Sequence, residues 1–183
     1  MGTGTSTGLT TQDIKSLQKS TPFTHEEVAL LLKRYSSFDS SPGGNTGMSC
    51  VECVQMPEFA SNPFALAVIE SMKDSNTTKI HPRQFLAICS IFSPRTNASE
   101  KKEKLFKLFD KEDKNVLRHD HMFRLFKTMF GNALSDDHIL ALTFHTLSDH
   151  SLANEGEITL AEFSKMVTDS EINDKFTIEF SPS

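Results

Sequence analysis

The stretch from Glu155 to Phe163, which reads EGEITLAEF, decides the fold because its spacing occurs four times in the chain. In this copy Ile158 lies four residues before Glu162, and the apolar Phe163 follows directly. The equivalent triplets are Met48, Glu52 and Cys53; Ile80, Gln84 and Phe85; and Leu117, His121 and Met122. The copies are spaced by roughly 30 to 40 residues, which indicates a repeated structural unit.

This spacing is that of the second half of an EF-hand loop. The apolar residue at loop position 8 pairs with the neighbouring loop, position 12 supplies a bidentate calcium ligand, and the next apolar residue begins the exiting helix. Apolar residues at helical spacing stand before and after each loop, as in Val28, Leu31, Leu32 and Tyr35. The sequence therefore predicts an all-α fold of four EF-hand helix–loop–helix units in two lobes.

Local signals place several helix ends. Thr24 and Glu27 have the spacing of a capping box, and so have Thr159 and Glu162. Asn62 and Pro63 predict a helix start with Pro at the first helical position. A SPRTNAS stretch interrupts the helical pattern and predicts the boundary between lobes. We expect an arm over 1–22, a first lobe over 23–93, a linker over 94–100, a second lobe over 101–170 and a tail over 171–183.

Composition excludes several classes of protein. The formal charge of −5 gives no reason to expect nucleic acid as a partner. No apolar run reaches membrane-spanning length and no signal peptide is visible, and the three cysteines suggest reduced thiols in the cytoplasm. The 15 Phe and 7 Met residues suit an adaptable groove for a partner helix, and the alternative is a Phe-rich core.

The calcium ligands are unevenly preserved. Loop two has Lys73 at position 1 and Gln84 at position 12, and loop three has Lys114 at position 5. A cation at a ligand position removes an oxygen and repels calcium, so we expect no calcium in these two loops. Loops one and four keep their closing glutamate, and each has an aspartate two residues before position 1, as if it were lengthened by two residues.

Calcium at hand four is accordingly the alternative that the sequence leaves open, with hand one a weaker candidate and no other cofactor. The candidate ligands are Asp149, Glu155, Glu157, Thr159 and Glu162 in loop four, and Asn45 and Glu52 in loop one. The interpretation that the sequence favours is that all four are pseudo-hands, retained because paired helix–loop–helix units shape a groove. Such a groove would bind a partner without calcium.

The sequence gives only weak signs of zinc binding or catalysis. Cys50 and Cys53 form a C-x-x-C motif, but no second pair follows and Cys53 occupies a core position. His119 and His121 are two residues apart and face different sides of a helix, which argues against zinc. Because no nucleophile–base group or phosphate loop is present, we expect that the protein is not an enzyme.

The chain resembles the calcineurin B-like EF-hand family over nearly its whole length. The residues that carry the resemblance are Met1-Gly2 with Ser6, Phe23-Thr24-His25, Met56-Pro57-Glu58-Phe59 with Asn62-Pro63, Phe85 to Ser93, and Met129-Phe130-Gly131-Asn132-Ala133-Leu134. The resemblance implies a two-lobed regulatory subunit that binds an amphipathic helix of a larger protein, here a calcineurin-like phosphatase catalytic subunit. Family members usually bind calcium in several hands, and this sequence departs from them there.

The helix-binding groove is expected to draw on the second lobe. Its candidate residues are Phe106, Phe109, Met122, Phe126, Met129, Phe130, Phe144 and Phe163. Alternative functions are a calcium sensor that uses hand four and hand one, or an adaptor for an ion exchanger, kinase or receptor tail. The Met-Gly-x-x-x-Ser start predicts N-myristoylation of Gly2, and hence peripheral membrane contact by an otherwise cytoplasmic protein.

Overall fold

The computed structural model describes residues 9–44 and 46–180, and within them the fold is all-α. The first half contains α1 (Thr11–Lys19), α2 (His25–Phe38), a 3₁₀ turn (Pro42–Gly44), α3 (Cys50–Val54), α4 (Pro57–Ala60), α5 (Ala65–Met72) and α6 (Pro82–Phe92). The second half contains α7 (Ala98–Phe109), β1 (Val116–Leu117), α8 (His119–Phe130), α9 (Asp136–Leu147), β2 (Ile158–Thr159), α10 (Leu160–Met166) and α11 (Asp169–Lys175). None of the described helices is long and apolar enough to cross a membrane.

The chain divides into two compact units. Unit 1 contains residues 1–96 together with 177–183, and unit 2 contains residues 97–176. The division falls between Thr96 and Asn97, and α7 begins at Ala98. The last residues belong to unit 1, which the order of elements along the chain does not predict.

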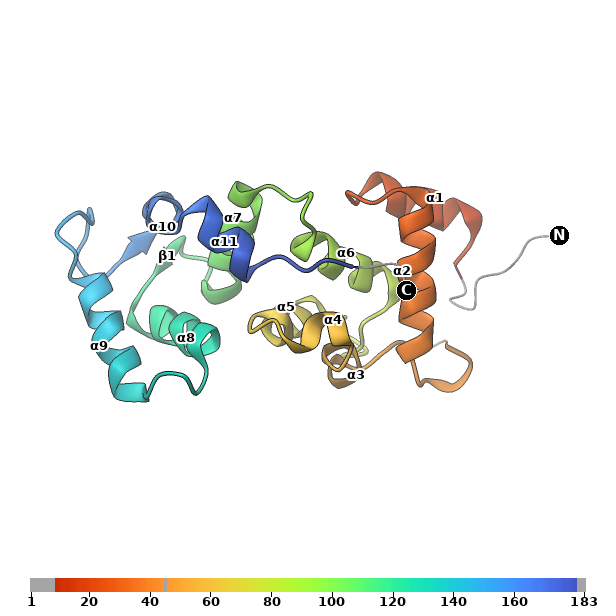
Figure 1. The fold of residues 1–183 in the computed structure, drawn as a ribbon, viewed down its shortest axis with the longest axis horizontal. Coiled ribbons are helices and arrows are strands. Elements are labelled where there is room, and N and C mark those ends of the chain that lie inside the picture. Colours follow the sequence, from red (N-terminus) through yellow and green to blue (C-terminus); the bar gives the residue numbers. More distant parts are fainter. Residues whose placement is uncertain (1–8, 45, 181–183) are drawn as a thin grey trace. The chain divides into compact units, whose positions relative to one another are not determined.

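Unit 1 is built around α2, which packs against α1 and α6, while α3 packs against α5 (Figure 1). Aromatic side chains fill its core. The ring of Phe85 lies 5.4 Å from that of Tyr35 and 6.3 Å from that of Phe59, both measured between centroids. The Phe-rich composition of the first half is therefore used largely for packing.

Unit 2 also consists of helices packed in pairs around a pair of loops. Helix α8 packs along α9, and α7 packs against α10 and α11 (Figure 1). Two lysines of α7 are buried there. The Lys102 ammonium donates to the Ser164 carbonyl at 3.0 Å and to Asp169 at 2.6 Å, which neutralises the charge and caps the end of α10.

The loops pair as their apolar position 8 predicts. In unit 1 Met48 and Ile80 exchange both backbone hydrogen bonds, at 3.0 and 2.8 Å. In unit 2 strands β1 and β2 are antiparallel and place Leu117 opposite Ile158. These four side chains are fully buried, so each pair closes one end of a core.

Most predicted helix ends are confirmed, with two corrections. Both predicted capping boxes are present. The predicted start at Asn62-Pro63 is too early, because Asn62 instead accepts the N–H of Phe64 and the helix begins at Ala65. Residues 171–175, expected as tail, complete α11, whose own capping box joins Thr168 to Glu171.

Candidate calcium loops and partner-binding surfaces

The two retained loop glutamates are occupied by donors of their own loops. In loop one Glu52 accepts the N–H of Ser49 at 2.7 Å and its hydroxyl at 2.6 Å, and the other carboxylate oxygen accepts the Ser40 hydroxyl. The Ser40 and Ser49 hydrogen bonds lower the pKa of Glu52 from 4.5 to about 2. The carboxylate that could clamp calcium is thus used as a cap for α3.

Loop four repeats this arrangement. One Glu162 oxygen accepts the N–H of Ala153 at 2.7 Å, and the other accepts the N–H and the hydroxyl of Thr159 at 2.8 and 2.7 Å. These bonds, that to Ala153 first, lower the pKa of Glu162 from 4.5 to about 2. A backbone N–H from position 3 lies where a calcium site would present an oxygen, so the loop closes on the glutamate directly.

The substituted loops retain part of this capping role. His121, at position 12 of loop three, accepts the N–H of Arg118 through Nδ1 at 3.2 Å. The equivalent Gln84 in loop two has a buried Oε1 with no hydrogen-bond partner among the described residues. Position 12 therefore acts as a helix cap in three of the four loops, whether its side chain is Glu or His.

The sharp turn expected at loop position 6 is present in loops two, three and four, and two of these loops form it without glycine. Counted back from position 12, position 6 is Thr78 in loop two, Asn115 in loop three and Gly156 in loop four, with φ values of 57°, 58° and 82°. A positive φ is strained for threonine because its branched side chain crowds the backbone. The paired loops impose this turn even where the residue does not favour it.

The remaining candidate ligands of loop four do not converge on one point. Asp149 accepts the N–H of Ser151 at 2.8 Å, and Glu157 forms an ion pair with Arg118 at 2.7 Å. Glu155 is exposed and Ala153, at position 3, has no side-chain oxygen. Across residues 9–44 and 46–180, no three His, Cys, Asp or Glu side chains are grouped so that they could hold a metal ion. The residues as placed do not fit calcium, and Asn45 lies outside the described residues.

A buried tyrosine, predicted only as part of an apolar helix face, joins the loop pair of unit 1. The Tyr35 hydroxyl donates to the Ile80 carbonyl at 2.8 Å and accepts the N–H of Met48 at 3.2 Å. Burial raises the pKa of this phenol. Because the hydroxyl contacts both position-8 residues, α2 is fixed to both loops without a metal ion.

The eight predicted groove residues divide into two groups. Buried in unit 2 are Phe106, Phe109, Met122 and Phe163, and partly or largely exposed are Phe126, Met129, Phe130 and Phe144. The exposed group lies on α8 and α9, the two helices that pack along each other. Phe126 and Phe130 contact each other with ring centroids 6.3 Å apart.

Helix α9 is apolar on two faces. Ile139, Thr143 and Leu147 are buried, whereas Leu140 and Phe144 are 38% and 56% exposed. Leu140 and Phe144 are four residues apart and so share one face. Leu140, Phe144 and the partly exposed aromatic residues of α8 are therefore apolar side chains of unit 2 that remain accessible to solvent.

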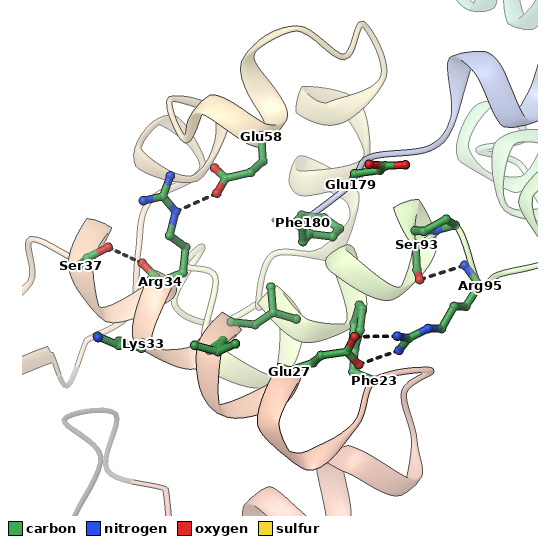
Figure 2. Close-up of a pocket in the computed structure, with 13 residues that line it drawn as sticks. Phe23, Glu27, Lys33, Arg34, Ser37, Glu58, Ser93, Arg95, Glu179 and Phe180 are labelled. Carbon is green, nitrogen blue, oxygen red and sulfur yellow. Dashed lines mark hydrogen bonds and ion pairs between the residues drawn. The ribbon is translucent and has the colours of Figure 1, made fainter. Parts of the chain in front are cut away.

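A second site, whose lining combines apolar residues with charged and polar ones, lies in unit 1 and was not predicted. It is a cavity of about 450 Å³ lined in part by Phe23, Leu30, Leu31, Pro94 and Phe180. Two ion pairs stand at its rim, Arg34 with Glu58 at 2.7 Å and Arg95 with Glu27 at 2.6 Å (Figure 2). In the sequence, the alternating apolar residues Phe176, Ile178 and Phe180 are a signal for this site, but their pattern does not indicate where the segment packs.

The cysteines and histidines fit roles in packing. Cys53 and Cys89 are buried, and burial raises the pKa of Cys53 to about 12, which makes it a poor metal ligand at neutral pH. His119 lies against Phe144 with ring centroids 4.8 Å apart. Gly2, the predicted acylation site, lies outside the described residues.

Known proteins match this chain over 92% to 100% of its length. No protein-family model matches it. The calcineurin B protein of Naegleria gruberi is 30% identical over 178 residues, which are 97% of this chain and 99% of the relative. The calcineurin B protein of Candida glabrata is 24% identical over 168 residues, 92% and 95% of the two chains, and the type 2 calcineurin B protein of Dictyostelium discoideum is 24% identical over 184 residues, 100% and 99%.

The match in length means that both units take part in the likeness. The fold is that of a helical protein with two units, and in each unit two helix-connecting loops pair with each other. The relatives add that proteins of this kind include subunits of calcineurin, as their names say. The chain belongs to the calcineurin B-like family.

Proposed function

We propose that the protein is a divergent calcineurin B-like regulatory subunit composed of four EF-hand-derived units. It binds an amphipathic helix of a calcineurin-like phosphatase catalytic subunit through apolar surfaces rich in Phe and Met. Its calcium binding is weak or lost. A myristoyl group on Gly2 would add membrane contact of modest strength, since one acyl chain gives only marginal affinity.

The observation that carries this proposal is the internal capping of Glu52 and Glu162. Both position-12 carboxylates accept hydrogen bonds from their own loops, and a calcium ion would have to displace these bonds before the carboxylates could chelate it. The loops thereby keep their pairing and their turns, which supports a scaffold that is folded before any calcium arrives. A partner helix would then bind at resting calcium concentration.

The exposed apolar surface supports the second part of the proposal. Phe144 is 56% exposed on a helix whose adjacent face is already buried. Exposing an aromatic ring of this size is unfavourable in water unless another apolar surface covers it. The relatives, named as subunits of calcineurin, suggest what that surface belongs to.

The test is copurification with the calcineurin catalytic chain of Naegleria gruberi, carried out in EDTA and again in 1 mM calcium. We expect a complex of equal yield in both, because the scaffold does not need the ion. Phe144→Ala should weaken the complex about tenfold, the effect of losing roughly 1.4 kcal/mol of apolar contact. His145→Ala, at the neighbouring exposed position, is the matched control.

Three results would count against the proposal. A complex that forms only with calcium would favour a calcium sensor instead. Calorimetric binding of several calcium ions at micromolar affinity would contradict the loss of the sites. Absence of a complex in both buffers would favour an adaptor for another partner, such as an exchanger, kinase or receptor tail.

A further inference from the structure

The C-terminal segment Thr177–Phe180 packs into unit 1 beside the cavity described above. The N–H of Ile178 donates to the carbonyl of Phe92, the last residue of α6, at 2.8 Å. The Ile178 side chain is 7% exposed. The segment is therefore docked on unit 1 by its backbone and by a buried side chain, although unit 2 precedes it in the chain.

Phe180 fills an aromatic position in that site. Its ring lies edge-on to Phe59, with centroids 5.7 Å apart, and to Phe23, with centroids 6.5 Å apart. Figure 2 shows the ring of Phe180 between the Arg34–Glu58 and Arg95–Glu27 ion pairs. Phe23 precedes α2 and Phe59 lies in α4, so the ring joins two separate parts of unit 1.

The segment does not fill the space available. The cavity of about 450 Å³ still has Phe180 as one of its walls, and such a volume is ordinary for a pocket that binds a ligand. Leu30, at the pocket, is 44% exposed, and Phe180 itself remains partly exposed. The site can therefore receive a larger apolar group than the one the tail supplies.

We propose that Thr177–Phe180 is a displaceable internal occupant of the unit 1 pocket, which is a docking position for a large apolar side chain of the partner's amphipathic helix. The proposal deepens the function proposed above and rests on it. Phe180 shows the chemistry that the pocket accepts: an aromatic ring set edge-on between Phe23 and Phe59. A partner ring cannot take this position until Phe180 leaves it, so the tail lowers apparent affinity by the fraction of time that it is bound.

A single-tryptophan variant would report this exchange directly. The sequence contains no Trp, so Phe180→Trp in the full chain places the only indole at the pocket. The probe is a synthetic peptide of the helix by which the Naegleria gruberi catalytic chain binds calcineurin B, with any Trp replaced by Phe. We expect the peptide to shift the Trp emission to longer wavelength as the indole moves into water.

Phe180→Ala in the full chain tests the competition itself. Removing the competing ring should tighten peptide binding about tenfold, because a partly buried Phe contributes roughly that factor to tail docking. Asp174→Asn, an exposed change in α11 just before the tail, is the matched control and should leave affinity unchanged.

The outcomes separate this inference from the proposed function. Peptide binding with unchanged emission and unchanged affinity in Phe180→Ala would overturn the tail's role and leave the proposed function intact. Binding only to Phe180→Ala would support the tail as a complete block. No binding to any variant would overturn the proposed function and the displacement together.

Discussion

Replacing Glu52 by alanine would separate a helix cap from a calcium ligand. The carboxylate accepts the N–H and hydroxyl of Ser49 and the hydroxyl of Ser40. Loss of a capping-box partner costs about 1 kcal/mol, and loss of a hydrogen bond between a hydroxyl and a partly buried carboxylate costs about 1 kcal/mol more. We expect Glu52→Ala to reduce the free energy of unfolding of unit 1 by about 2 kcal/mol.

The assay is differential scanning calorimetry in EDTA. For a unit of this size a loss of about 2 kcal/mol lowers Tm by roughly 10 °C. Glu52→Gln keeps an acceptor for the Ser49 N–H and should lose less than half as much. Glu70→Ala, an exposed glutamate on α5 in the same unit, is the control and should change stability by less than about 0.5 kcal/mol.

A calcium ligand would behave in the opposite way. Without the ion its removal would cost nothing, or would even stabilise by relieving repulsion. With the ion the wild type would gain about 2.7 kcal/mol at a hundredfold excess over Kd, and the variant would not. Unchanged Tm in EDTA, together with loss of a calcium-dependent rise in Tm, would refute the capping argument.

Three further predictions concern the loops. Folding lowers the pKa of Glu162 to about 2, so at acid pH this carboxylate binds more protons in the unfolded chain than in the folded one. The contribution of Glu162 to stability should therefore be complete above about pH 5 and should fall towards pH 2. In urea titrations from pH 6 to 2, the free energy of unfolding should fall less in Glu162→Gln than in the wild type. An equal fall in both proteins would contradict the lowered pKa of Glu162. Tyr35→Phe should cost about 1–2 kcal/mol in urea denaturation because Met48 and Ile80 lose a buried shared partner, and a neutral result would exclude the hydroxyl as their link. Thr78→Gly should stabilise by about 1 kcal/mol in the same assay by relieving a φ of 57°, and destabilisation would show that the turn is not strained.

The loop spacing was sufficient to predict how the loops would pair. An apolar residue four positions before the loop end must be buried against an equivalent one, and Met48 with Ile80 and Leu117 with Ile158 do so. The caps at Thr24 and Thr159 could also be predicted, because each involves residues only three apart. Interactions confined to one turn of helix are encoded locally.

The candidate ligands could be predicted only by residue type. Counting positions identified Glu162 as a chelating residue, but not that the Ala153 N–H would bind to it instead. The choice between a cap and a ligand depends on how the loop backbone closes, which a count of positions does not contain. The groove residues are similar: Phe126 and Phe106 look alike in sequence, yet one is partly exposed on α8 and the other is buried against Phe163 of α10.

The repeated helix–loop–helix plan, the positions of the caps and the lysines at ligand positions of loops two and three all follow from spacing and residue type, and so could be predicted without coordinates. The packing of Phe180 against Phe23 and Phe59 could not, because these residues lie more than a hundred positions away in the chain. Such a contact forms wherever apolar area can be buried, and burial depends on the shape left open by helices already packed. The same holds for the surface of α9 that exposes Phe144, since a helix with two apolar faces can bury only one of them within its own unit.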